Sequence, residues 1–194
     1  MEMNIYRRKL LNAILFFAAN THFAGPTKIS KLLCYLDFTH FKQTGHPSIG
    51  LKYYAFKNGP VPKSLWLEIK DGNLPEDFVE HLDLVKRTDL KYEGSKFIAK
   101  TTPVLNVFTP REIKILKHYA KKFKDTTASE ISEISHQEKQ PWHITYHTLG
   151  PNAPIDYMLA VDDGADVSKE DAAESLKSHF EIVTNFHIYP TTQQ

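Results

Sequence analysis

The sequence contains a single cysteine and almost no surplus of either charge. Cys34 has no second cysteine to pair with and lies in the apolar run KISKLLCYL, which favours a core residue of a reduced cytoplasmic protein over a nucleophile. The 24 basic and 23 acidic residues leave a net charge of +1, so the chain as a whole is not attracted to nucleic acid or membranes. We therefore expect a cytoplasmic protein whose partners are recognised by local features of its surface.

Long apolar segments and the usual enzyme motifs are also missing from the sequence. No apolar run approaches the ~20 residues of a membrane span, and LLNAILFFAA has the periodicity of a buried helix rather than of a secretory signal. No glycine-rich dinucleotide motif, Walker motif or G-x-S-x-G motif occurs. The two prolines of NGPVP remove backbone N–H groups that a phosphate-binding loop needs. We expect no cofactor, no small-molecule substrate and no enzymatic activity.

Helical periodicity and capping residues predict that most of the chain is helical. The predicted helices begin near Ile5, at Thr27 as an N-cap, at Pro62 or Ser64, and after Thr109, Thr127 and Ser168. Gly45 is expected to end the second helix, and the pairs Thr109 with Glu112 and Thr127 with Glu130 form capping boxes. The apolar stripe of the last helix consists of Ala173, Leu176, Phe180 and Val183.

Two segments have the pattern of strands. Residues Leu51 to Phe56 are rich in aromatics, and residues 82–100 alternate in polarity about a turn expected at Gly94-Ser95. A chain of 194 residues is long enough to bury one core without a disulfide or a metal. The pattern predicts the α+β class: a mainly helical single domain with a small antiparallel β-sheet.

The strongest candidate for a binding site is an aromatic elbow at residues 51–69, LKYYAFKNGPVPKSLWLEI. Asn58-Gly59 tolerates the positive φ of a chain reversal, and the two prolines reduce the conformational freedom lost on binding. Aromatic side chains suit a rigid ridge that binds protein, and they suit a buried core equally well. The candidate partner-binding residues are Tyr53, Tyr54, Phe56, Asn58, Gly59, Pro60, Val61, Pro62, Trp66 and Trp142.

Two other functions stay open from the residues alone. A metal-dependent enzyme could use the His136 to His147 cluster, where His143 and His147 have i, i+4 spacing. The glutamate of an H-E-x-x-H motif is absent there and Pro141 shortens any helix, so we expect no bound metal. A nucleic-acid-binding regulator could use the basic helix 111–124, although the balanced charge of the chain favours a solvated helix face.

Four segments, taken in order, resemble one known family. They are KISKLLCYLDFTHFKQTGHP, LKYYAFKNGPVPKSLW, FTPREIKILKHYAKKF and TASEISEISHQEKQPW. Each is modest alone, whereas all four in order resemble the Panacea, or SocA-like, antitoxin domain, also labelled phage-associated protein GepA, over about residues 14–157. The matching positions are Lys31, Leu32, Leu33, Gly45, Tyr54, Gly59, Pro60, Val61, Leu65, Phe108, Glu112, His136 and Trp142.

The resemblance implies a bacterial or phage antitoxin with a place in toxin–antitoxin systems and phage defence. Such a protein neutralises a toxin encoded by an adjacent gene through direct protein–protein binding, without catalysis. Residues 1–157 are expected to form the antitoxin domain, and residues 158–194 a helical extension packed on it. A homo-oligomer is compatible with this interpretation, whereas nucleic-acid and membrane partners are not expected.

Overall fold

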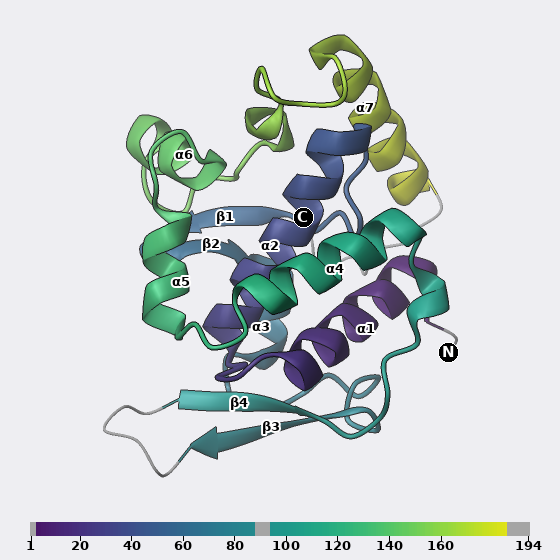
Figure 1. The fold of residues 1–194 in the computed structure, drawn as a ribbon, viewed down its shortest axis with the longest axis vertical. Helices are drawn as coiled ribbons and strands as arrows, with labels where there is room; N and C mark the ends of the chain where they lie inside the picture. The colour runs from purple at the N-terminus through teal and green to yellow at the C-terminus, as the bar shows by residue number, and fades with distance from the viewer. Residues whose placement is uncertain (1–2, 88–93, 186–194) are drawn as a thin grey trace.

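A computed structural model describes residues 3–87 and 94–185, which form a mainly helical α+β domain with two small antiparallel sheets (Figure 1). The predicted fold class is confirmed, with two small sheets in place of the one expected. The elements are α1 (Ile5–Asn20), α2 (Pro26–Thr44), β1 (Tyr53–Phe56), β2 (Gly59–Pro62), α3 (Lys63–Ile69), β3 (Leu82–Arg87), β4 (Gly94–Ala99), η1 (Leu105–Val107), α4 (Pro110–Lys122), α5 (Ala128–Ser135), α6 (Pro141–Leu149), η2 (Tyr157–Ala160) and α7 (Lys169–Asn185).

Helix α1 lies at the centre of the core. Every residue from Leu10 to Phe17 is buried, because α2, α4 and β4 pack on different sides of this helix (Figure 1). The polar residue within this apolar run, Asn12, is satisfied: its Nδ2 donates to the Arg8 carbonyl at 2.8 Å and its Oδ1 accepts from the Val104 N–H at 2.6 Å. The buried first helix is therefore confirmed. Among the described residues, no helix is both long and apolar enough to cross a membrane.

Helix α2 begins two residues earlier than the sequence predicted. Its N-cap is Gly25 and its first residue is Pro26, so the prediction of Thr27 as the N-cap is wrong. A proline in the first turn needs no N–H partner, and its fixed φ starts the helix before the threonine is reached. The predicted end is confirmed: Gly45 adopts a left-handed φ of 74° and donates its N–H to the Phe41 carbonyl.

The two sheets are hairpins that pack on opposite sides of the helical core (Figure 1). Strand β1 is shorter than predicted, because the Leu51 N–H bonds to a side chain of α2 rather than to a strand. In the second hairpin, Gly94 and Ser95 pair with Arg87 and Lys86, so the turn predicted at those two residues is wrong. Gly94 is extended, without a positive φ, and residues 88–93 that join the strands lie outside the described residues.

The predicted capping boxes of α4 and α5 are both present. Thr109 accepts from the Glu112 N–H while Glu112 accepts from the Thr109 N–H, and Thr127 and Glu130 repeat the arrangement. Ser168 accepts from the Asp171 N–H at 3.1 Å at the start of α7, as expected. The predicted stripe of α7 needs one correction, because Ala172 is buried and Ala173 is exposed.

Candidate partner-binding site

The aromatic elbow is a β-hairpin formed by β1 and β2, whose two faces differ in burial. Tyr53 and Ala55 point into the core, whereas Tyr54 and Phe56 are half-buried on the outer face. Val61 pairs with Tyr54 and extends the outer face across β2. The period of two that sorts side chains in any strand therefore divides the predicted site into a buried half and an accessible half.

The two prolines of the hairpin occupy positions that leave the β1–β2 ladder intact. In the observed register, Pro60 lies opposite Ala55 and Pro62 opposite Tyr53. Alternate pairs of an antiparallel ladder exchange hydrogen bonds, so the proline pairs are the ones that do not, and their nitrogens face the outer edge of β2, where the Pro60 carbonyl accepts from Lys31 of α2. An edge without N–H donors cannot add a further strand. Strand β2 was not predicted from the sequence, although its two prolines exclude only an interior strand and not an edge strand.

Gly59 lies directly over a buried lysine of α2. Its φ is 102°, and a Cβ at this position would lie 2.6 Å from Lys31 Cε and 2.6 Å from Ser135 Oγ. Lys31 is completely buried, and its Nζ donates to the Pro60 carbonyl at 3.2 Å. Burial lowers the pKa of Lys31 to about 8. The hairpin thus rests on an ammonium group that forms no ion pair within the described residues.

Trp142 supports the tip of the hairpin from α6. Its Nε1 donates to the Phe56 carbonyl at 2.9 Å, and its ring stacks between His136 at 3.9 Å and Tyr146 at 4.7 Å. Trp142 is 6% exposed, so its side chain holds the hairpin in place and offers a partner almost no surface. Burial, followed by the nearby Lys31 charge, lowers the pKa of His136, which favours the neutral ring beneath the hairpin.

Tyr53 belongs to a buried network around a carboxylate that the sequence analysis did not single out. Asp37 is completely buried in α2 and accepts from five donors: the N–H groups of Ile49, Gly50 and Leu51 and the hydroxyls of Tyr53 and Tyr157. Burial raises the pKa of Asp37, and the backbone and tyrosine donors oppose that rise. Tyr53 therefore fixes the start of β1 and does not face a partner.

Five of the ten predicted residues remain accessible, and they gather on one surface. Trp66 is 39% exposed and packs edge-to-face on Phe56 with ring centroids 5.7 Å apart. Lys63 Nζ lies 5.2 Å from the centre of the Tyr54 ring. We use the name hairpin surface for these five residues together with the exposed Lys57 between them: Tyr54, Phe56, Lys57, Asn58, Val61 and Trp66. The other predicted residues are buried beneath it: Tyr53, Gly59, Pro60, Pro62 and Trp142.

The histidine cluster does not assemble into a metal centre. His143 and His147 share α6, which begins at Pro141 rather than being shortened by it, and their ring centroids are 4.3 Å apart. In the part of the chain that the structure describes, no group of three or more His, Cys, Asp or Glu residues is placed to hold a metal ion.

Burial raises the pKa of the Cys34 thiol, which makes it a poor nucleophile.

The described residues form a mainly helical α+β domain that carries the hairpin surface on one side. A family model for the antitoxin SocA-like, Panacea domain matches residues 29–143, more than half of the chain. The protein therefore belongs to the SocA-like, Panacea antitoxin family, as the four sequence segments indicated. A search of curated proteins and a search of solved structures each found no match.

Proposed function

We propose that this protein is an antitoxin that neutralises a cognate toxin, encoded by an adjacent gene, through direct binding in the cytoplasm. The observation that carries the proposal is the family match over residues 29–143. The matched segment runs from α2 into α6 and so contains the hairpin with its supports, Lys31, Ser135 and Trp142. Binding without catalysis is the mode of action that we assign to it.

The hairpin surface is our candidate for the contact with the toxin. Hydrogen bonds from Lys31 and Trp142 hold the hairpin from below, so little conformational freedom remains to be lost on binding. The half-buried Phe56 and the exposed Trp66 form an aromatic pair, the kind of anchor that dominates interface energies. Truncation of such an anchor costs about 2 kcal/mol or more of binding free energy.

We further propose that residues 1–157 act as the antitoxin domain and that residues 158–194 are an extension packed on it. Two observations support this division. Helix α1 supplies the centre of the core although it precedes the matched segment, and the Tyr157 hydroxyl donates to the Leu51 carbonyl at 2.7 Å. Helix α7 packs on Gly45 through Ala172 and Ser175, at the end of α2.

Co-expression tests the proposed function. The adjacent reading frame, induced alone, should arrest growth, and co-expression of this protein should restore it. Phe56→Ala with Trp66→Ala should lose the rescue, whereas Val85→Ala, an equally exposed apolar residue on β3, should keep it. Trp66 is 39% exposed and Phe56 is half-buried, so this double variant should melt lower than the wild type, and the rescue is compared at a temperature at which the variant stays folded. An adjacent product that does not arrest growth, or that is not relieved by the wild type, would contradict the proposal.

A further inference from the structure

Helix α4 exposes a row of cations that no other part of the chain matches. The row consists of Arg111, Lys114, Lys117, Lys121 and Lys122 on α4 and of Lys124 just beyond its end. The single acidic residue among positions 111–124 is Glu112, which is buried and bonded to Lys9 at 2.7 Å. Because this segment holds six of the 24 basic residues and one of the 23 acidic ones, the rest of the chain has a net negative charge.

These cations are not neutralised by the described residues, unlike lysines elsewhere. Lys9, Lys42 and Lys100 each lie within 4 Å of a carboxylate. Within residues 3–87 and 94–185, none of the six cations of the row forms an ion pair. Arg111 Nη1 donates to a neutral group, Gln43 Oε1, at 3.3 Å.

The row works against the stability of α4. Like charges at i, i+3 and i, i+4 repel by about 0.2 to 0.5 kcal/mol per pair, and Arg111, Lys114, Lys117 and Lys121 form a chain of such pairs. Lysines in the last turn, Lys121 and Lys122, suit the helix dipole. Arg111 and Lys114 lie in the first half of the helix, where the dipole disfavours cations. An anionic partner would relieve both effects.

Hollows on both sides of α4 give such a partner a place to bind. Between α1 and α4 lies a groove of about 480 Å³, with Lys117, Lys121 and Lys124 above the apolar Phe16 and Ala120. Between α2 and α4 lies a groove of about 630 Å³, where Arg111, Lys114 and His118 surround Ile115 and Tyr119. Charged rims over partly apolar floors suit an amphipathic polypeptide segment.

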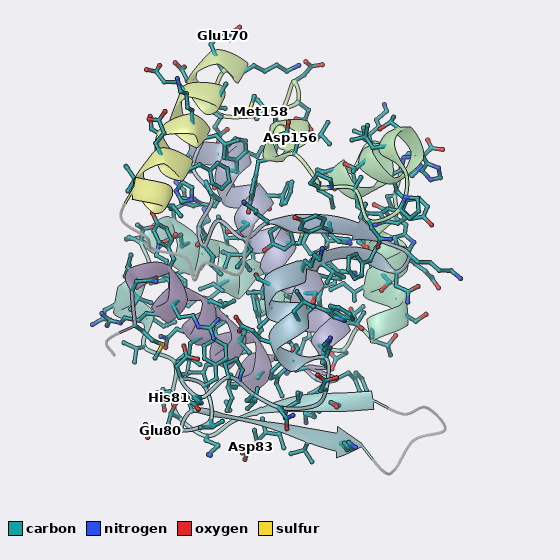
Figure 2. The ribbon with its side chains drawn as sticks, turned by 180° about the vertical axis from the view of Figure 1, so that it is seen from behind. Glu80, His81, Asp83, Asp156, Met158 and Glu170 are labelled. Carbon is teal, nitrogen blue, oxygen red and sulfur yellow. The ribbon has the colours of Figure 1, made fainter. Side chains whose placement is uncertain are left out.

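Carboxylates lie beyond both ends of the basic row, and their positions favour a short acidic polypeptide over a nucleic acid as the partner. Beyond one end lie the exposed Glu130 and Glu133 of α5, and Asp166 lines the groove at the other end. Asp156 and Glu170 lie at one end of the molecule and Glu80 and Asp83 at the opposite end (Figure 2). The row spans about 20 Å at 1.5 Å per residue. A longer duplex would meet all of these carboxylates, whereas a short acidic segment of a protein would meet only Asp166, which lines the same groove as Arg111 and Lys114.

We infer that α4 and its two grooves bind an acidic segment of the toxin, about 20 Å long. The inference rests on the proposed function and adds the chemistry of the partner. Helix α2 separates this basic surface from the hairpin surface, since it packs against both α4 and β2. Helix α5 follows α4 in the chain and packs on β2, so a toxin that contacts both surfaces reaches around α5.

Binding kinetics test the inference, with the polypeptide encoded by the adjacent gene as the probe. Arg111→Glu with Lys114→Glu should lower the association rate by about 10-fold or more at low salt and remove most of the salt dependence. Acidic residues suit the N-terminal half of a helix, so this variant should melt no lower than the wild type. Lys169→Glu with Lys177→Glu on α7 changes the net charge equally and should bind like the wild type.

The possible outcomes separate this inference from the proposed function. If the wild type neutralises the toxin and the α4 variant binds it equally fast, the inference is wrong and the function stands. If the wild type neither binds nor neutralises the adjacent product, both are wrong. If a DNA duplex of about 20 base pairs binds the wild type and is released by the α4 variant, the surface belongs to nucleic acid and the inference is overturned. Protection of Lys114 and Lys117 from acetylation in the toxin complex would support it.

Discussion

Replacement of either of two buried lysines of α2 by methionine should change the stability of the protein, in opposite directions for the two positions. Lys28 and Lys31 are both completely buried, and burial lowers the pKa of each to about 8. They differ in their acceptors. Lys31 has the Pro60 carbonyl at 3.2 Å, whereas Lys28 has the carbonyls of His22 and Thr126 at 2.7 Å and that of Lys124 at 3.3 Å.

The expected change in the free energy of unfolding for Lys31→Met follows from the pKa of Lys31. A fall from 10.5 to about 8 corresponds to about 3 kcal/mol of free energy that opposes the buried charge. Removal of one charged hydrogen bond costs about 1.5 kcal/mol. Lys31→Met should therefore stabilise the protein by about 1 to 2 kcal/mol at pH 7, which raises the melting temperature by roughly 2 to 8 °C in a domain of this size. Lys28→Met removes the same opposing free energy but loses three charged hydrogen bonds at about 1.5 kcal/mol each, so it should destabilise the protein by about 1 to 2 kcal/mol.

The advantage of Lys31→Met should also depend on pH. Between pH 8 and 10.5 the folded wild type releases the Lys31 proton while the unfolded chain keeps it, so wild-type stability rises with pH by up to about 1.4 kcal/mol per pH unit. The gain from Lys31→Met should accordingly shrink between pH 7 and 9. Denaturant unfolding of the wild type and both variants at the two pH values measures this. A destabilised Lys31→Met variant, or a gain that is the same at both pH values, would refute the reasoning.

Three further substitutions test the supports of the fold. Gly59→Ala should destabilise the protein by about 2 to 5 kcal/mol, because Gly59 has a positive φ and the added Cβ would collide with Lys31. Gly72→Ala is the control: its φ is 80° but nothing lies within 4 Å, so it should destabilise the protein less in the same thermal melts. Asp37→Asn should cost about 3 kcal/mol or more in urea unfolding, because an amide N–H₂ would face donors of its network. For Glu112, burial raises the pKa but bonds from Lys9, Thr109 and Ser48 hold it below the usual value, so its stabilisation is lost as pH falls below about 4.5. Glu112→Gln should be about 2 to 3 kcal/mol less stable at pH 7 and less sensitive to acid.

Local capping chemistry explains what the sequence could predict. Thr109 with Glu112 and Thr127 with Glu130 satisfy the first N–H groups of their own helices, so these boundaries follow from neighbouring residues alone. Gly45 is equally local, because the left-handed end of α2 needs no distant partner. The family segments were recognisable for the same reason, since they consist largely of such local features.

Burial in the candidate site could not be predicted, because distant segments decide it. Lysine is normally exposed, and Lys31 is buried only because β2 and α5 close over α2. Trp142 is a support rather than an anchor because the Phe56 carbonyl, far away in the sequence, lies beside its indole. The five donors around Asp37 likewise come from residues 49–53 and 157. Aromatic composition located the elbow, and tertiary packing divided it into a buried and an exposed half.

Isothermal titration of the purified protein with the polypeptide encoded by the adjacent gene tests the central claim most directly. The account predicts a saturable complex with a dissociation constant on the order of a micromolar or tighter. Phe56→Ala with Trp66→Ala should weaken it by about 1,000-fold, at about 2 kcal/mol per anchor, and a melting curve checks that the variant is folded at the temperature of the titration. No heat of binding from the wild type, or an unchanged affinity in the folded double variant, would contradict binding through the hairpin surface.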